Sequence, residues 1–320
     1  MEDTIQKLLA PGKGLLAADE STKTISKRFE SLGLISTPEL NKKYREMLFN
    51  TPGIENYISG VILFDESVRQ NLHQILINKN IVPGIKVDEG LAPFNNSEEQ
   101  VTKGLDSLDV RLKEYSSLGL KFTKWRGVFK ISDKYPSDAF FEENLTRMAK
   151  FAKISQENNM VPIIEPEVLL EGNHTTTRSS ETLDETLTKL FEKLKLENVD
   201  LTKVIVKTSM ALPGPESGVV ALPLEVANAT LRALKKSVPN EVPGIVFLSG
   251  GQTPDQATLN LNEIVKLKSG VSWQLSFSFS RALQEEAMKE WSGKNENITS
   301  AQQVFFSRLE RVSKARNGQL

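Results

Sequence analysis

The 320-residue sequence contains no cysteine and only two histidines, His73 and His174. Without cysteine, the chain can form no disulfide, cannot attack a substrate with a thiol and cannot hold a metal ion through thiolates. A zinc site or a Ser-His-Asp triad would depend on His73, in a stretch of helical pattern, or on His174, in a polar loop. We expect both histidines instead to be solvated or to cap helices, and we expect no metal site.

The sequence also lacks an excess of charge and a long apolar run. Its formal net charge is -1, so no general attraction to nucleic acids or membranes is indicated. No stretch reaches the roughly 18 apolar residues of a membrane span, and the N-terminal segment has no apolar run of signal-peptide length. We therefore expect a cytoplasmic protein with neither nucleic-acid nor membrane partners.

Short apolar runs of strand length are present instead, and segments with helical periodicity separate them. This alternation predicts a (β/α)8 TIM barrel that forms a single domain over residues 1–320, with short N- and C-terminal extensions. A doubly wound open sheet is the alternative, but the glycine-rich dinucleotide loop that it would favour is absent after the first run. The eight runs cover residues 14–19, 60–65, 84–88, 120–126, 161–167, 203–209, 244–250 and 274–280.

Local patterns predict the ends and faces of several helices. Threonine followed by proline predicts a helix start at Thr37 and at Thr253, where Gln256 completes a capping box. The final segment, residues 313–320, is expected to be a frayed tail. Two apolar stripes predict buried helix faces. They consist of Leu183, Leu187, Leu190, Phe191 and Leu194, and of Leu224, Ala227, Leu231 and Leu234.

Ionisable residues occupy the C-terminal ends of several predicted strands. Side chains two positions apart share one face of a strand, and catalytic residues of barrels gather at the C-terminal ends of the strands. We therefore expect these side chains to converge in the barrel mouth, although charges at strand ends can also form plain solvated ion pairs. The bases outnumber the acids by one, which favours an anionic substrate. The residues are Asp19, Lys86, Asp88, Lys124, Arg126, Glu165, Glu167, Lys207 and, just after the last strand, Arg281.

Two places can bind phosphate. Ser249-Gly250-Gly251-Gln252 forms a turn that enters a helix, where free backbone N–H groups make an anion cradle, and Arg281 follows the eighth strand. The second place comes just after the first strand, although a solvated basic helical turn explains it equally well. It consists of Ser21, Thr24, Lys27 and Arg28.

Lys207 follows three β-branched residues, and a lysine held in apolar surroundings near other cations can attack a carbonyl carbon to form a Schiff base. We expect Lys124 and the apolar neighbours to keep the Lys207 amine uncharged. Glu165 and Asp19 can supply the acid and the base that this chemistry needs. The iminium acts as the electron sink, so neither a metal nor another cofactor is required. Spacing alone leaves Lys124 and Lys86 as alternative nucleophiles.

Seven segments of the chain read GKGLLAADEST, GVILFDE, GIKVDEG, FTKWRGVFKI, VPIIEPEVL, GIVFLSGGQT and SFSFSRALQ. In this order, over about residues 10 to 305, they resemble the motifs of class I fructose-bisphosphate aldolase of the animal and plant type. The resemblance implies a metal-independent lyase of glycolysis and gluconeogenesis, commonly a homotetramer. Its substrate is a phosphorylated sugar, fructose 1,6-bisphosphate, which it cleaves to dihydroxyacetone phosphate and glyceraldehyde 3-phosphate.

The resemblance also implies roles for individual residues. Lys207 forms the Schiff base, and Glu165, with Glu167 beside it, serves as acid and base. Asp19 assists removal of the C4-hydroxyl proton, and Lys124 orients and protonates near the reacting centre. The remaining implied residues bind substrate. They are Lys86, Arg126, Ser21 and Thr24 along the substrate and at its C6-phosphate end, Ser249, Gly250 and Arg281 at the C1-phosphate, and Gly251 and Ser278, which are assigned to no particular end.

The chain departs from the family pattern at three places. Thr208-Ser209 replaces Pro-Asn after the lysine, and Phe279 and Ser280 replace the tyrosine and glycine of a Ser-Tyr-Gly-Arg motif. Ser280 is expected to narrow the backbone approach to phosphate. The chain ends at Leu320, without the tyrosine-ended tail of the animal enzymes. These departures bear on the rate of enamine protonation and on the preference between bisphosphate and monophosphate substrates, whereas cleavage itself is compatible with them.

Two other functions fit the barrel. One is a different Schiff-base enzyme, either transaldolase-like or a deoxy-sugar phosphate aldolase. The other is a catalytically silent barrel that acts as a binding or scaffold protein. The full set of charged residues argues against a silent barrel, because such a protein would be free to lose them.

Overall fold

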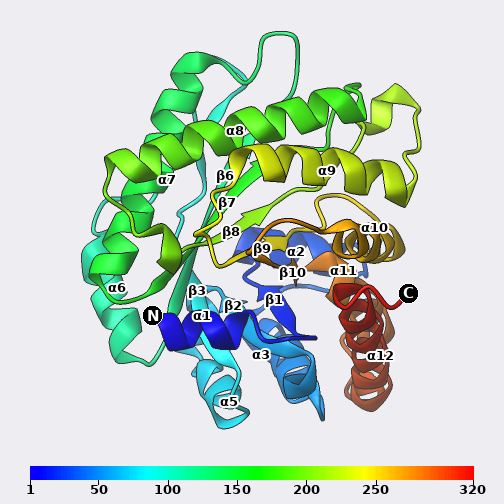
Figure 1. The fold of residues 1–320 in the computed structure, drawn as a ribbon. Coiled ribbons are helices and arrows are strands. Elements are labelled where there is room, and N and C mark those ends of the chain that lie inside the picture. The colour runs from blue at the N-terminus through cyan, green and yellow to red at the C-terminus, as the bar shows by residue number, and fades with distance from the viewer.

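Eight parallel strands close into a barrel in the computed structural model, which describes residues 1–320 (Figure 1). The barrel closes because β1 pairs with β10 on one side and with β2 on the other, which excludes the open sheet. Each of the eight predicted runs supplies one strand. The strands, in chain order, are β1 (Gly14–Ala18), β2 (Ile58–Leu63), β3 (Val82–Lys86), β6 (Phe122–Phe129), β7 (Val161–Val168), β8 (Ile205–Thr208), β9 (Gly244–Phe247) and β10 (Gln274–Phe279).

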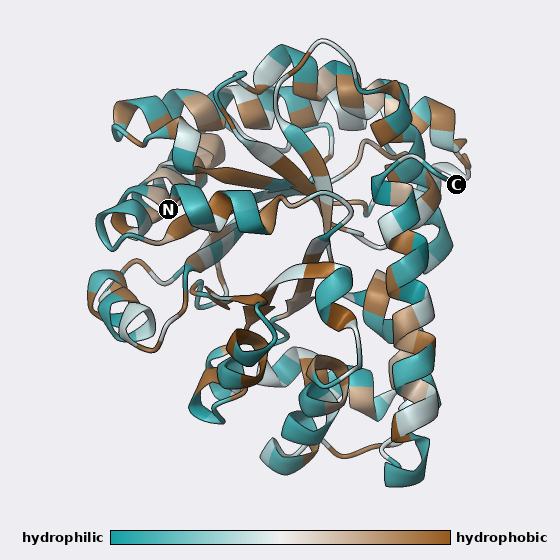
Figure 2. Cartoon of the chain, turned by 60° about the horizontal axis from the view of Figure 1, so that its bottom comes forward, coloured by the Kyte–Doolittle hydropathy of each residue, from teal (hydrophilic) through white to brown (hydrophobic).

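Helices surround the barrel, with polar and apolar residues alternating along them, and the strands at the centre are largely apolar (Figure 2). A short antiparallel hairpin, β4 (Leu91–Pro93) and β5 (Gln100–Thr102), is inserted after β3. None of the helices combines the length and the apolar character that crossing a membrane requires. The helices are α1 (Glu2–Leu8), α2 (Thr22–Glu30), α3 (Pro38–Phe49), α4 (Asp65–Arg69), α5 (His73–Asn78), α6 (Leu108–Ser117), α7 (Asp138–Glu157), α8 (Thr176–Leu196), α9 (Pro223–Ser237), α10 (Pro254–Leu267), α11 (Arg281–Trp291) and α12 (Ile298–Arg316).

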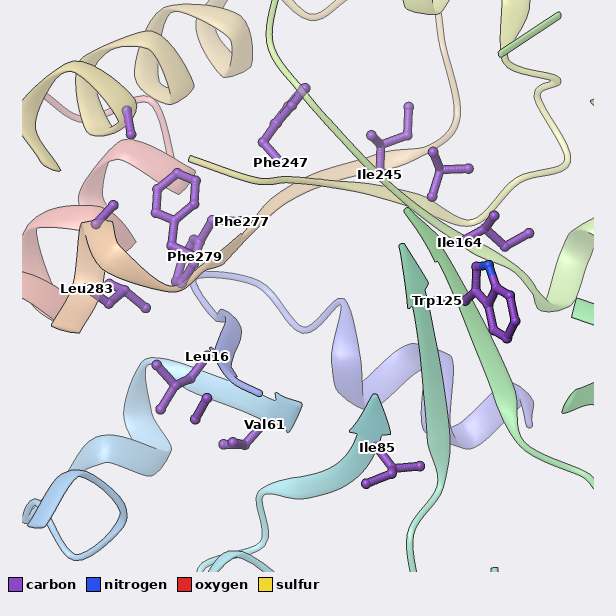
Figure 3. Packing of buried hydrophobic residues seen from close by; sticks show 14 of the residues in the cluster. Leu16, Val61, Ile85, Trp125, Ile164, Ile245, Phe247, Phe277, Phe279 and Leu283 are labelled. Carbon is purple, nitrogen blue, oxygen red and sulfur yellow. The ribbon is translucent and has the colours of Figure 1, made fainter. Parts of the chain in front are cut away.

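Apolar side chains form two separate layers because alternate residues of each strand face opposite ways. On β1, Leu15 and Ala17 belong to the cluster inside the barrel, whereas Leu16 and Ala18 belong to the larger cluster between strands and helices. Figure 3 shows part of this outer layer, including Trp125 of β6. The parity of each strand therefore determines which of its residues reach the barrel mouth.

The end of the barrel opposite the mouth is closed by α1. Leu8 and Leu9 of this segment join the inner cluster, where they cover the first residues of the strands. A Cβ atom on Gly244 would lie 2.6 Å from Cδ1 of Leu9, so a larger residue at position 244 would displace Leu9 from the end of the barrel. With this end filled, the mouth is the open end of the barrel.

The predicted helix starts are confirmed, since Thr37 and Thr253 are N-caps and Gln256 completes the capping box. The stripe on α8 is buried as predicted. On α9, however, Leu224 is exposed, because the buried face there runs through Val226 instead.

The expectation of a frayed tail is wrong. Helix α12 continues to Arg316, and Val312 and Ala315 are fully buried. The backbone N–H of Leu320 donates to Oδ1 of Asn262, at 3.0 Å. Apolar contacts on one face of α12 and this side-chain bond therefore hold the segment in place.

The expectation for the histidines is also wrong, because His73 and His174 are both buried. Burial lowers the pKa of each imidazole, since a charged ring would lose its hydration. His73 begins α5, and His174 lies in the loop between β7 and α8.

Candidate active site

A cavity of about 690 Å³ opens at the C-terminal ends of the strands. Its deepest side chains continue the inward parity of the strands: Asp19 follows Leu15 and Ala17, and Lys207 follows Ile205. The same alternation brings three further inward-facing pairs of strand positions together, as predicted from the spacing of two residues. These are Lys86 and Asp88 at the end of β3, Lys124 and Arg126 of β6, and Glu165 and Glu167 of β7.

Three buried side chains and the partly buried Asp19 form a continuous network at the centre of the cavity. Oε1 of Glu165 lies 3.0 Å from Nζ of Lys207, and Oε2 of the same carboxylate lies 3.3 Å from Nζ of Lys124. Nζ of Lys124 on β6 in turn lies 2.6 Å from Oδ2 of Asp19. Asp19 directly follows β1, a strand that does not neighbour β6 in the barrel. The carboxylate in direct contact with Lys207 is therefore Glu165, and the cations and anions alternate across the barrel mouth.

This alternation determines the protonation of the network. Burial alone would raise the pKa of Asp19, but Lys124 and then Lys207 outweigh it and lower that pKa to about 2. Burial likewise opposes ionisation of Glu165, yet the same two lysines lower its pKa. For Lys124, burial favours the neutral amine, but Asp19 and Glu165 outweigh it and raise the pKa. Lys124 is thus a fixed ammonium between two carboxylates.

Ion pairs at the edge of this network orient the neighbouring side chains. Oδ1 of Asp88 lies 2.6 Å from Nζ of Lys86, and Oδ2 of Asp88 lies 4.0 Å from Nζ of Lys124. Arg126 pairs with Glu167 on the adjacent strand. All of these partners come from β3, β6 and β7 or directly follow them, so the order of strands in the barrel decides which charges meet.

Two hydroxyl groups after Lys207 tie β8 to β7. Oγ of Ser209 donates to the carbonyl of Val168 and accepts from its N–H group, both at 2.9 Å. Thr208 donates to the carbonyl of Pro166 at 3.4 Å. Because the two strands carry Lys207 and Glu165, these bonds help to fix the separation of that pair.

The turn after β9 has the shape of an anion cradle. Gly250 and Gly251 both adopt positive φ, at 36° and 79°, a region that other residues rarely enter. Ser249 and Gly250 line the cavity, whereas Gly251 does not. Thr253 then caps α10, so the turn leads into a helix N-terminus that favours an anion.

A second group of polar residues enters the cavity from the first turn of α2. Ser21 is the N-cap of this helix and accepts a hydrogen bond from the N–H of Thr24. Arg28 of the same helix is paired with the buried carboxylate of Glu20 at 2.5 Å. Nη2 of Arg28 also donates to Oγ of Ser280, at the other end of the chain, at 3.0 Å.

The structure brings together all but one of the residues that sequence analysis assigned to catalysis or substrate binding. Gly251 lies behind the lining, and Asp88 lines a neighbouring cavity that Lys86 and Ser21 also reach. Sequence analysis missed Glu20. This residue directly follows Asp19 and so falls outside the spacing of two residues by which the inward-facing side chains were recognised. The predicted residues that line the main cavity are Asp19, Ser21, Thr24, Lys27, Arg28, Lys86, Lys124, Arg126, Glu165, Glu167, Lys207, Ser249, Gly250, Ser278 and Arg281.

Cationic side chains outnumber anionic ones around the cavity, and the excess is larger than the single base expected from the residues at the strand ends. Eight lysine or arginine side chains face four carboxylates, so the site favours an anionic ligand. No group of three or more histidine, aspartate or glutamate side chains is arranged to hold a metal ion. The eight cations are Lys23, Lys27, Arg28, Lys86, Lys124, Arg126, Lys207 and Arg281.

Comparisons with known proteins agree with this site. The family model described as "Glycolytic: Fructose-bisphosphate aldolase class-I" matches residues 1–320. Fructose-bisphosphate aldolase 4, cytosolic, of Arabidopsis thaliana is 42% identical over 315 residues, which cover 96% of this chain and 80% of that protein. The cytoplasmic isozyme 1 of Pisum sativum is 42% identical over 318 residues, covering 97% and 89%.

A solved structure shares the whole fold. The fructose-bisphosphate aldolase from Plasmodium falciparum superposes with a TM-score of 0.97 and 41% sequence identity, over 99% of this chain and 94% of that one. The barrel and the match over its full length lead to the same conclusion. The chain belongs to the class I fructose-bisphosphate aldolase family.

Proposed function

We propose that Lys207 is the nucleophile of this enzyme and that Glu165 is the group that moves protons to and from it. One observation carries the proposal: Nζ of Lys207 lies 3.0 Å from Oε1 of Glu165, and both side chains are buried at the centre of the cavity. An amine becomes nucleophilic when it loses a proton, and a carboxylate at this distance can accept one.

The chain catalyses the reversible cleavage of fructose 1,6-bisphosphate to dihydroxyacetone phosphate and glyceraldehyde 3-phosphate. Enzymes of this class use a lysine Schiff base, and they act on phosphorylated sugars. The excess of cations around the cavity supports binding of such an anion.

The first half of the reaction concerns Lys207 and Glu165. The amine attacks the C2 carbonyl carbon, and the resulting carbinolamine must lose its hydroxyl group as water. Glu165 gives a proton to this leaving hydroxyl, which leaves an iminium at C2. The carboxylate is suited to both transfers because Lys124 on its other oxygen stabilises the ionised form without taking part in the bond changes.

The second half breaks the C3–C4 bond. Asp19 accepts the C4-hydroxyl proton, the C4–O bond becomes the carbonyl of glyceraldehyde 3-phosphate, and the C3–C4 electron pair moves into the iminium to give an enamine. Lys124, at 2.6 Å from Asp19, balances the negative charge of that carboxylate and orients it. Protonation of the enamine and hydrolysis of the iminium then release dihydroxyacetone phosphate and the free Lys207.

Two groups of residues are assigned to the two phosphates. Ser249 and Gly250 of the cradle, with Ser278 and Arg281, bind the C1-phosphate, and Gly251 behind them completes the turn. The part of the cavity lined by the first turn of α2, by β3 and by β6 binds the C6-phosphate end. Its residues are Ser21, Thr24, Lys86 and Arg126.

Residues 1–320 are proposed to act as one catalytic domain of a cytoplasmic homotetramer. The support is the family, and the names of the Arabidopsis and pea relatives, which are called cytosolic and cytoplasmic. Light scattering is expected to give four times the mass of the chain, and the mass of a single chain would contradict the assembly. Cell fractionation tests the location.

The roles are tested by steady-state cleavage kinetics of three lysine variants. Lys207→Met is expected to lower kcat by more than about 10⁴-fold, because no other amine replaces the nucleophile. Lys86→Met, a matched change in the same cavity, is expected to act mainly on KM. A Lys207→Met enzyme that keeps a tenth of the normal kcat would show that Lys207 is not the nucleophile. If only Lys124→Met lost all turnover, Lys124 would be the nucleophile instead.

A further inference from the structure

The hydroxyl group of Ser280 bonds three side chains at the wall of the cavity. It donates to Oε1 of Glu20 at 2.9 Å and accepts from Nη2 of Arg28 at 3.0 Å. It also accepts from Nε2 of Gln284 at 3.3 Å. A serine hydroxyl has one proton to donate and two lone pairs, so these three bonds use its whole capacity. Ser280 therefore has no hydrogen bond left for a ligand.

The partners of Ser280 are themselves held firmly. Glu20 is buried and also pairs with Nη1 of Arg28 at 2.5 Å, so both terminal nitrogens of this guanidinium are bonded. Gln284 is fully buried, donates to the carbonyl of Ala17 on β1 and accepts from the hydroxyl of Tyr44 on α3. The hydrogen-bonded group of Ser280, Glu20, Arg28 and Gln284 is thus attached to the barrel through β1 and to the packed helix α3.

Arg28 and Arg281 form a wall between two cavities. Both line the main cavity, and both also line an adjoining cavity of about 200 Å³ between α2 and α11. Ser280 directly precedes Arg281 and starts α11 as its N-cap residue. It is therefore connected to one arginine through the backbone and to the other through its side chain.

We propose that Ser280 is a positioning residue that fixes Arg28 relative to Arg281 for the C1-phosphate of the substrate, an inference that rests on the proposed assignment of Arg281 to that phosphate. Two of the five N–H groups of Arg28 donate to Glu20 and Ser280, which leaves three for a ligand in the cavity. A preset guanidinium binds a dianion more tightly, because less side-chain freedom is lost on binding. A residue without the hydroxyl would leave Arg28 attached to Glu20 alone.

The test measures the Kd of dihydroxyacetone phosphate by titration calorimetry, together with kcat for cleavage. Ser280→Ala is expected to raise Kd about tenfold, the effect of one lost hydrogen bond to a charged group, with a smaller change in kcat. Ser280→Thr, which keeps the hydroxyl, is expected to restore Kd to within about twofold. Ser31→Ala is the matched control and is expected to leave Kd unchanged, since Ser31 lines the same two cavities but bonds only the backbone carbonyl of Arg28 and not its guanidinium.

A double-mutant cycle with Arg28→Gln separates positioning from general loosening of the fold. In that background, Ser280→Ala is expected to change Kd by less than about twofold, because the group that it positions has been removed. An unchanged Kd in Ser280→Ala, or a tenfold rise that persists with Arg28→Gln, would overturn the proposal. Calorimetry reports binding whichever lysine is the nucleophile, so failure of the Lys207 assignment is recognised separately by its own kinetic test.

Discussion

Glu165 bridges Lys207 and Lys124, with Oε1 of its carboxylate 3.0 Å from Nζ of Lys207 and Oε2 3.3 Å from Nζ of Lys124. The three residues belong to neighbouring strands, β8, β7 and β6, and all three side chains face into the barrel. One carboxylate therefore contacts both the proposed nucleophile and a permanent cation. This arrangement lets it exchange a proton with Lys207 while Lys124 holds its position.

Replacement of Glu165 by glutamine is expected to slow catalysis strongly while substrate still binds. The amide has nearly the same size but can neither accept nor donate the required proton, so kcat should fall about 10²- to 10⁴-fold. Steady-state kinetics with fructose 1,6-bisphosphate measure this change. Glu167→Gln, on the same strand and paired with Arg126, is the comparison and should lose less. A Glu165→Gln enzyme with more than half of the normal kcat would rule out the proton-transfer role.

Asp19 is expected to make stability depend on pH in a defined window. Its pKa is lowered from 3.8 to about 2 in the folded chain, so the unfolded state binds the proton more tightly. The stabilisation is complete above the unfolded pKa and is lost as the pH falls toward 2; it amounts to about 2 kcal/mol. Urea unfolding of the native chain and of Asp19→Asn, between pH 6 and pH 3, measures the difference between them. That difference should shrink on acidification, and one that stays constant would refute the linkage.

Gly250 is expected to be required for ligand binding more than for folding. A Cβ atom there would lie 2.6 Å from Cδ1 of Leu248, and the backbone has positive φ. Gly250→Ala should therefore distort the cradle and raise KM about tenfold, with a loss of about 1 kcal/mol in unfolding free energy. Gly33→Ala is the control, because Gly33 also has positive φ but open space around it. Equal KM values for the two variants would argue against a cradle at Gly250.

Chelation is expected to leave the activity unchanged. The iminium on the lysine accepts the electron pair of the broken C3–C4 bond, so the cleavage step needs no Lewis acid. Cleavage rates before and after incubation with EDTA and dialysis provide the comparison. A loss of activity that zinc or another divalent ion restores would contradict this expectation.

Much of the barrel mouth was predictable from the sequence because two simple rules apply to it. Strand parity and position at the C-terminal end of a strand together identify Asp19, Lys124, Glu165 and Lys207 as neighbours in one site. The expectation that Lys124 and the apolar neighbours keep the Lys207 amine uncharged stays a prediction, and the structure adds that Glu165 lies in contact with Lys207. Such contacts depend on the spatial order and relative height of the strands, which periodicity does not contain.

Contacts made by closure of the barrel were beyond prediction. Glu20 and Ser280 lie 260 positions apart and meet only because β1 pairs with β10. The burial of His73 and His174 likewise results from packing of loops and helices around them, whereas their local sequences are polar or amphipathic. The docking of the final residues on α10 depends on a side-chain bond from Asn262 that no helical pattern reveals.

The most direct test of the account is to trap the Schiff base. Borohydride reduces the iminium formed with dihydroxyacetone phosphate to a stable secondary amine, and peptide mapping by mass spectrometry locates the modified lysine. We expect the adduct on Lys207 and none on Lys124 or Lys86. An adduct on either of those lysines, or no adduct in a preparation that cleaves fructose 1,6-bisphosphate, would contradict the account.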